Sequence, residues 1–307
     1  MTPSNTATSS IVTALLALPN QPTITAITRA ESSATFPSAL KVAKGDLDDP
    51  AFLLSALKGQ DALILCLGFA VPIAAQHALI DAAAEASVKF VVPTEFGSDT
   101  DNAALNEAVP MLGAKRQLRE YVESLGKSSW IGLVNNPWTD YSLAAGMFGI
   151  DVPARTATLY TDGGKDVAFR TTTLAQAGRA VAALMALPEE RLRGYENRMV
   201  YVSSFRVSGR ELLEAVQRAT AASGTGVKEG EWKVEVKTVQ ERRESGLEKL
   251  DSGDHMGMVD LLYAATMTEG LGDEYPKGKT MNEELGLPQE NLDEFVGKFV
   301  KGLEVSS

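Results

Sequence analysis

The chain has 307 residues, of which 44% are hydrophobic and 22% charged, as is ordinary for a globular protein of one large or two unequal domains. Its net charge of −11 argues against a nucleic-acid partner, because a phosphate-binding surface needs an excess of lysine and arginine. No apolar run reaches the roughly 18 residues of a membrane helix, and the N-terminal segment lacks the basic start of a secretory signal. The single cysteine, Cys66, excludes an internal disulfide framework and fits a reducing compartment. We therefore expect a cytoplasmic protein with neither a nucleic-acid nor a membrane partner.

The first half of the chain alternates helix patterns with short apolar or β-branched runs. Helices are expected at residues 9–18, 50–57, 73–86 and 109–125, and strands at residues 23–28, 40–43, 62–67, 88–92 and 129–134. Strands that alternate with helices are typical of parallel sheets, in which a helix connects one strand to the next. The pattern predicts an α/β fold with a doubly wound, mostly parallel sheet of the Rossmann type.

The second half is less regular. Short strands are expected at residues 158–160, 167–170, 199–203 and 232–239, and helices at residues 172–187, 211–222 and 283–303. We divide the chain into a dinucleotide-binding domain of residues 1–145, to which residues 171–204 return, and a smaller domain. The smaller domain, residues 146–170 and 205–307, is expected to be mainly helical and to bind the substrate.

A polar loop with the sequence PTEFGSD follows the strand predicted at residues 88–92. Ligands of doubly wound sheets bind at the carboxyl ends of the strands, where this loop would lie. The next predicted helix carries Lys115 and Arg119. Residues four apart lie on one face of a helix, so both side chains can reach a single site.

These features occur in an order that resembles the NmrA-like and isoflavone-reductase-like proteins, which are atypical short-chain dehydrogenase/reductase relatives that bind NADP(H). The order is Gln76, then VKFVVPTEFGSD at residues 88–99, then Lys115 with Arg119. Further similar segments are ITRAES at residues 27–32, VAKGDLDDPAFLLSALKGQDALI at residues 42–64, and NNPW at residues 135–138. The resemblance is good over residues 11–138 and continues thinly to about residue 204.

The resemblance implies NADP(H) as cofactor, Lys115 as the general acid/base and Arg119 as a cofactor contact. A neighbouring positive charge would lower the pKa of Lys115 toward a useful range. The alternative for both side chains is a position without function on a solvated helix face, such as the face that carries Arg116 and Glu120. The positions implied to bind the cofactor are Thr28, Arg29, Asp46, Leu47, Leu67, Gly68, Gln76, Pro93, Thr94, Glu95, Phe96, Arg119 and Asn136.

Two of these positions also follow from general rules. An arginine at the end of the second strand of a dinucleotide fold accommodates the 2′-phosphate of NADP, so Arg29 predicts a preference for NADP(H) over NAD(H). Asn136 precedes Pro137, which favours an extended backbone and a fixed side-chain direction. The alternatives are a solvated surface arginine for Arg29 and a turn with a helix cap for the acids at residues 46–49.

The glycine-rich turn of the family is missing, since no glycine occurs before Gly45. Glycines are needed there because the backbone must approach the cofactor pyrophosphate closely. Aligning residues 11–12 with the usual helix puts Thr2, Asn5 and Thr8 at the glycine positions. The strand before the turn is central in such sheets, so both of its neighbours should have unpaired edges. Either the chain is an incomplete version of a longer protein or a divergent member with weak cofactor binding.

The other chemistries fare worse. His77 and His255 are the only histidines and have no cysteine partners, which argues against zinc. Tyr275 and Lys279 have the spacing of the short-chain dehydrogenase pair but lie in a segment rich in proline and glycine.

The first hypothesis is an NADPH-dependent reductase of a small, aromatic or polyketide-like metabolite. The alternatives are an NADP-binding, redox-sensing regulatory protein without turnover and a degenerate relative with weakened cofactor binding. Nothing in the sequence specifies the substrate or the oligomeric state.

Overall fold

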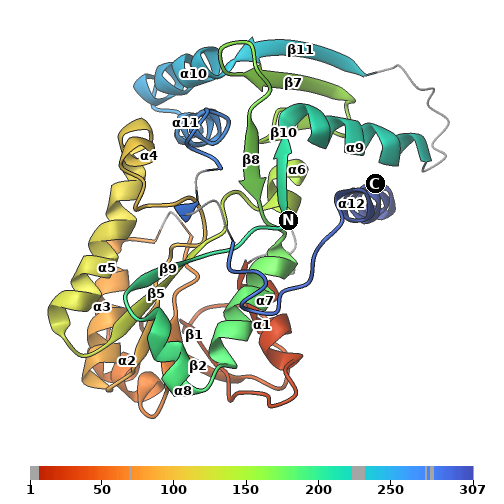
Figure 1. The fold of residues 1–307 in the computed structure, drawn as a ribbon. Helices are drawn as coiled ribbons and strands as arrows, with labels where there is room; N and C mark the ends of the chain where they lie inside the picture. The colour runs from red at the N-terminus through yellow and green to blue at the C-terminus, as the bar shows by residue number, and fades with distance from the viewer. Residues whose placement is uncertain (1–6, 69–70, 223–231, 274, 277–279, 307) are drawn as a thin grey trace.

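The structure is a computed structural model that describes residues 7–68, 71–222, 232–273, 275–276 and 280–306 (Figure 1). Its lower part in Figure 1 contains parallel strands: β1 (Thr25–Arg29), β2 (Lys41–Gly45), β3 (Ala62–Ile64), β4 (Phe90–Val92), β5 (Ser129–Val134) and β9 (Arg198–Tyr201). The order β3-β4-β5-β9 forms one sheet, and β1 pairs with β2 beside it. All of these pairings are parallel, which confirms the predicted Rossmann-type sheet.

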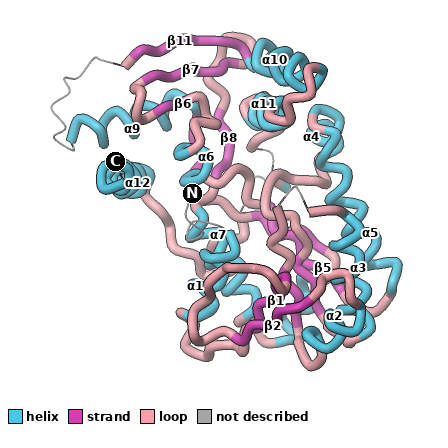
Figure 2. The backbone as a smooth tube through the Cα atoms, turned by 180° about the vertical axis from the view of Figure 1, so that it is seen from behind, coloured by secondary structure: helices cyan, strands magenta, loops and turns pink. Residues whose placement is uncertain are grey.

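Helices cover both faces of this sheet. They are α1 (Ala7–Leu16), α2 (Pro50–Leu57), α3 (Ile73–Glu85), α5 (Gly113–Leu125) and α7 (Leu174–Met185). Leu53, Ile80 and Val122 bring α2, α3 and α5 into one apolar core with Val91 of the sheet. The opposite face is covered by α1 and α7, whose core also contains Phe90, Val92 and Ile131 of the sheet. Figure 2 shows these helices on the two sides of the strands.

The expected unpaired edges are present. Within the described part of the chain, β1 pairs with β2 alone and β3 with β4 alone, so no strand pairing joins β1 to β3. Helix α1 nevertheless packs closely on α7. A Cβ on Gly178 would lie 2.4 Å from the backbone oxygen of Ser10, so glycine is what permits this approach.

The upper part of Figure 1 has a core of its own, including Phe148, Leu159, Phe169, Leu212 and Val296. Its strands are β6 (Ile150–Asp151), β7 (Thr156–Thr161), β8 (Ala168–Thr171), β10 (Phe205–Ser208) and β11 (Lys233–Thr238). Its helices are α6 (Thr139–Ala144), α9 (Gly209–Ala222), α10 (Val239–Asp251), α11 (Gly257–Thr266) and α12 (Leu292–Ser306). The division into two domains at the predicted boundaries stays a prediction.

Two helix predictions need correction. The helix expected over residues 109–125 begins only at Gly113, because Val109 leaves the helical backbone and Pro110 opens the short 3-10 turn η2 (Pro110–Leu112). Before it, a separate helix α4 (Ala103–Ala108) is capped by Asn102, whose side chain accepts a hydrogen bond from the Leu105 N–H. The helix expected over residues 283–303 starts at Leu292, after Pro288 and the left-handed Gly286. The remaining short helices are α8 (Glu189–Leu192) and η3 (Arg193–Tyr195).

The start of α7 is contacted by a half-buried carboxyl group, that of Asp140 in α6. Both oxygens of Asp140 accept from the Leu174 N–H, at 2.9 and 3.0 Å. Burial raises the pKa of Asp140 from its ordinary value of 3.8 to about 6, and the nearby Glu290 carboxylate acts in the same direction. The two backbone hydrogen bonds that Asp140 accepts lower the pKa but do not offset burial.

The raised pKa predicts that Asp140 contributes more to stability in mild acid than at neutral pH. A folded-state pKa above the unfolded value means that the stabilisation is complete below pH 3.8 and is lost as the pH rises through about 6. We expect the unfolding free energy contributed by Asp140 to rise by about 1 to 3 kcal/mol between pH 7 and pH 4. Denaturant titrations of the wild type and Asp140→Asn over this range measure it. Parallel pH profiles for the two proteins would contradict the assignment.

Candidate active site

The loop after β4 makes hydrogen bonds to the residues that follow β3 and β5, so three strand ends lie together. The Thr94 hydroxyl contacts the carbonyl oxygen of Leu65, just after β3, at 3.2 Å, and Oε1 of Gln76 in the first turn of α3 at 3.1 Å. The carbonyl oxygen of Gly97 accepts from the N–H groups of Asn135 and Asn136 after β5, at 3.0 and 2.9 Å. The polar groups that follow β3, β4 and β5 thus meet at one edge of the sheet, as predicted.

Lys115 points into this loop. It lies in the first turn of α5, and its amine donates a hydrogen bond to the backbone carbonyl of Glu95. The amine lies 3.4 Å from the position that a Cβ would occupy on Gly97, so it is directed toward the loop and away from the outer face of the helix. Burial lowers the pKa of Lys115, and the Glu95 carboxylate opposes that shift. The cause of the lowered pKa is therefore burial, and the neighbouring arginine invoked from the sequence is not needed for it.

Arg119 is almost fully buried and has protein partners. Its guanidinium makes an ion pair with Glu95 at 2.8 Å and another with Asp101 at 2.8 Å, and it donates to the Thr100 hydroxyl at 2.9 Å. It also lies over the ring of Trp130, 4.7 Å from the centroid. The Thr100 hydroxyl in turn donates to both Glu95 oxygens at 3.1 and 3.2 Å. Arg119 thus holds the loop together, and its predicted contact with a cofactor stays a prediction.

Asn136 differs from the sequence-based expectation. Its φ is 52°, which is left-handed backbone where extended backbone was predicted. This conformation accompanies two tertiary contacts, since the Asn136 N–H donates to Gly97 and its side-chain amide donates to the carbonyl oxygen of Gly272 at 2.8 Å. Asparagine tolerates left-handed backbone better than most residues, and these contacts outweigh the preference set by the following proline.

Asn135 is a candidate that the sequence reasoning missed. Its side chain is fully buried, and neither polar atom has a hydrogen-bond partner among the described residues. A buried amide without partners is costly, so such groups usually bind water or a ligand. The clue in the sequence was its position at the end of a buried strand, in the same NNPW segment as Asn136.

The other predicted cofactor residues follow the first strands. Arg29 ends β1 with a side chain 70% exposed, 3.4 Å from Glu31. Lys44 lies opposite Thr28 in β2, and its amine donates to the Ser32 carbonyl at 3.0 Å. Asp46 accepts from the Asp48 N–H at 2.9 Å, and the neighbouring Asp49 caps α2. The hydrogen bonds of Asp46 and Asp49 form a turn and a helix cap. This is the alternative role that the sequence analysis gave for the acids at residues 46–49.

The apolar residues among the predicted cofactor positions pack against the core, and the glycine borders open space. Leu47 and Leu67 are half-buried against the core that contains α2 and α3. Pro93 is buried, and Phe96 is buried with a φ of 24°. A Cβ on Gly68 would meet no atom within 4 Å, so this glycine borders open space. Their contact with a cofactor stays a prediction.

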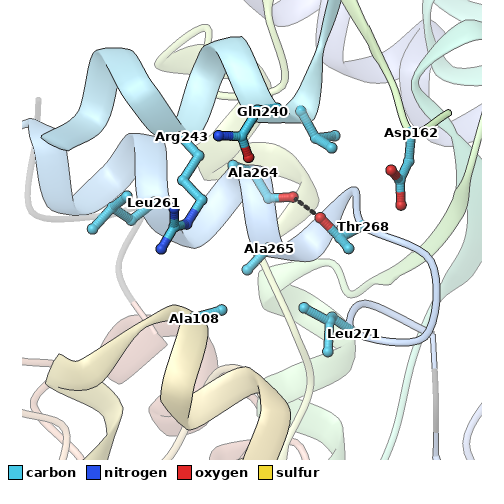
Figure 3. A pocket seen from close by; sticks show the side chains of 10 residues that line it. Ala108, Asp162, Gln240, Arg243, Leu261, Ala264, Ala265, Thr268 and Leu271 are labelled. Carbon is cyan, nitrogen blue, oxygen red and sulfur yellow. Dashed lines mark hydrogen bonds between the residues drawn. The ribbon is translucent and has the colours of Figure 1, made fainter. Parts of the chain in front are cut away.

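A separate pocket of about 270 Å³ lies between α4, α10 and α11 (Figure 3). The small side chains of Ala108, Ala264 and Ala265 leave this space, and Arg243 and Gln240 extend from α10 at its border (Figure 3). The Thr268 hydroxyl at its wall donates to the carbonyl oxygen of Ala264 at 2.9 Å. The remaining lining residues are Asp162, Val239, Leu261 and Leu271. No predicted site residue lines this pocket, so the candidate chemistry stays at the sheet edge.

Other kinds of site find no support in the described residues. They contain no group of histidine, cysteine and acidic side chains that could hold a metal ion. Burial raises the pKa of the Cys66 thiol to about 12, which disfavours a nucleophilic thiolate. His77 stacks on Tyr121 at 4.1 Å, as expected of a structural histidine. Lys279 of the Tyr275–Lys279 pair and the positions Thr2 and Asn5 lie outside the described residues. No described helix has the length and apolarity to span a membrane.

Comparison with known proteins gives consistent results. A curated relative, oxidoreductase aprR of Aspergillus flavus, is 30% identical over 285 residues, which cover 91% of this chain and 91% of the relative. A structure described as AtPrR2 with NADP+ and (+)pinoresinol superposes with a TM-score of 0.73 at 19% identity over 95% of both chains. A crystal structure of isoflavone reductase gives a TM-score of 0.70 at 20% identity over 97% of both chains. The profile of the NmrA-like family matches residues 6–225. The chain therefore belongs to the NmrA-like family.

Proposed function

We propose that the protein is an NADPH-dependent reductase of a small metabolite, of an aromatic or polyketide-like class. The observation that carries the proposal is the Lys115 amine, which is buried in the loop after β4 and has a lowered pKa. A lysine with a lowered pKa can give and regain a proton nearer neutral pH than an exposed one. The oxidoreductase name of the relative from Aspergillus flavus supports the same class of reaction.

The residues at the strand ends fit an NADP(H) molecule laid across the edge of the sheet. Arg29 and Lys44 supply positive charge beside the ends of β1 and β2, where a 2′-phosphate needs it. At the other end, beside β4 and β5, the Thr94 hydroxyl and the unpaired amide of Asn135 supply hydrogen-bonding groups for the nicotinamide half. Of the three positions aligned with the glycine-rich turn, Thr2 and Asn5 precede helix α1 in the sequence, and Thr8 lies in its first turn.

In the proposed reaction the hydride for a polarised carbon of the substrate would come from NADPH when it is bound. The Lys115 ammonium group gives its proton to the substrate atom that gains negative charge. The Glu95 carbonyl holds the amine before transfer, and burial favours the neutral amine that remains afterwards. Screening aromatic enones, quinones and polyketide-type ketones for substrate-dependent loss of NADPH absorbance tests the proposal. If the protein binds NADPH but no compound in the screen increases NADPH consumption, the result would favour a redox-sensing binding protein.

Arg29 makes the cofactor preference testable. Arg29→Glu should weaken NADPH binding at least about tenfold, because a carboxylate replaces the cation at the 2′-phosphate, with little change for NADH. Fluorescence titration with each cofactor measures both affinities. Lys58→Glu, an equal charge change at the exposed end of α2, is the matched control. Equal losses for NADPH and NADH would show that Arg29 does not contact the 2′-phosphate.

A further inference from the structure

We propose that Arg119 is a positioning residue, which acts through the buried side chain of Glu95 to fix the backbone carbonyl that holds the Lys115 amine. The inference rests on the proposed function of Lys115. It replaces the expected contact between Arg119 and the cofactor with a role inside the protein. Glu95 is the centre of the arrangement, because its side chain binds Arg119 while its backbone binds Lys115.

The first step is the fixation of the Glu95 side chain. It is 1% exposed and touches Arg119 at 2.8 Å and the Thr100 hydroxyl at 3.1 and 3.2 Å. Its methylene groups pass β5 at Gly132, where an added Cβ would lie 3.4 Å from Cγ of Glu95. A buried carboxylate is tolerated only while its partners satisfy it, so these contacts determine where the side chain lies.

The second step is the orientation of the Glu95 carbonyl. The φ of Phe96 sets the rotation of the peptide group between Glu95 and Phe96, and its value is 24°. Such backbone is rare for a residue other than glycine and persists only where surrounding contacts impose it. The anchored Glu95 side chain on one side and the Gly97 carbonyl, bonded to Asn135 and Asn136, on the other impose it here. The peptide oxygen consequently faces the Lys115 amine.

The third step is the charge around the amine. The charge of the Glu95 carboxylate opposes the effect of burial on the pKa of Lys115. The other titratable groups of the loop have partners of their own, since Asp101 pairs with Arg119 and Asp99 accepts from the Tyr201 hydroxyl at 3.2 Å. Burial also raises the pKa of Glu95, and Lys115 and Arg119 counteract that rise. The Arg119–Glu95 pair therefore acts on both the position of the carbonyl that holds the Lys115 amine and the charge beside that amine.

Substitutions of the two oppositely charged residues, Arg119 and Glu95, distinguish a positioning role from structural support alone. The pKa of Lys115 is measured from the pH dependence of its acetylation by acetic anhydride, followed by peptide mass spectrometry, and needs no substrate. In Arg119→Met the released Glu95 carboxylate and the opened loop should raise the pKa of Lys115 toward its ordinary 10.5. In Glu95→Gln the opposing acid is lost while Arg119 stays, so the pKa should fall further below the wild-type value.

Arg116→Met is the matched control, because Arg116 lies on the same helix and pairs with Glu120 at the surface, at 3.0 Å. It should leave the pKa of Lys115 unchanged. Should Arg119→Met not fold, Arg119→Lys serves, since it keeps the charge but cannot reach Glu95, Thr100 and Asp101 together. It should raise the pKa by a smaller amount. Shifts of the same sign in the Arg119 and Glu95 variants, or no shift in the Arg119 variants, would overturn the proposal.

The proposed reaction is tested separately. If Lys115 titrates as expected in all variants but no NADPH-dependent turnover exists, the positioning role stands and the reductase proposal fails. If turnover exists, the pH profile of kcat in Arg119→Lys should shift in the same direction as the pKa of Lys115. A turnover that depends on Lys115 with an unshifted pH profile would retain the reductase and remove the positioning role.

Discussion

Lys115→Met is expected to lower turnover by about 100- to 10,000-fold while leaving NADPH affinity almost unchanged. A positioned general acid typically contributes this factor, and methionine keeps the length of the side chain without the proton. The structure supports the choice of residue, because the amine lies in the loop after β4 and contacts the Glu95 carbonyl. The two quantities to measure are kcat with a substrate found by screening and the dissociation constant for NADPH.

Lys127→Met is the matched control, because Lys127 follows the same helix but is exposed. It should retain wild-type turnover. A Lys115→Met variant that turns over at the wild-type rate would exclude Lys115 from the chemistry. A variant that loses NADPH affinity as strongly as turnover would indicate that Lys115 binds the cofactor and does not supply the proton.

The second large effect concerns stability. Arg119→Met should lower the free energy of unfolding by about 3 to 5 kcal/mol, because it leaves the buried Glu95 carboxylate without its charged partner. Part of the loss comes from the lost contact between the guanidinium and the Trp130 ring. Denaturant titration at neutral pH measures the difference.

A double substitution separates the charge effect from the loss of packing. Arg119→Met combined with Glu95→Leu should be more stable than Arg119→Met alone, because no unpaired charge stays buried. The surface variant Arg116→Met should cost less than about 1 kcal/mol, as is usual for exposed ion pairs. Equal losses from Arg116→Met and Arg119→Met would mean that the buried pair is not a structural element of the loop.

The sequence predicted the parallel sheet because its strands are short, apolar runs separated by amphipathic helices. The burial of β4 and β5 on both faces explains why their patterns were clear. In the upper part β8 was predicted but β10 was not, and the two strands pair through contacts between residues far apart in sequence. β11 was expected at residues 232–239 and spans Lys233–Thr238, so this strand was predicted.

The candidate site was predicted as a set of positions but not as a set of interactions. The i, i+4 spacing placed Lys115 and Arg119 on one face of α5, yet one contacts a backbone carbonyl and the other a buried carboxylate. That difference depends on the path of the loop through Glu95, which no local pattern specifies. Asn135 and Asn136 show the same limit, because the pre-proline rule concerns one residue's backbone and not the Gly97 and Gly272 contacts that decide its conformation.

We propose that the edge of the sheet from Arg29 to Lys115 binds NADPH. Fluorescence titration of the purified chain with NADPH tests it most directly, with Arg29→Glu and Lys115→Met measured in parallel. We expect saturable one-to-one binding in the wild type, clear weakening in Arg29→Glu and nearly unchanged affinity in Lys115→Met. The absence of saturable NADPH binding in the wild type, or equal affinity in wild type and Arg29→Glu, would contradict it.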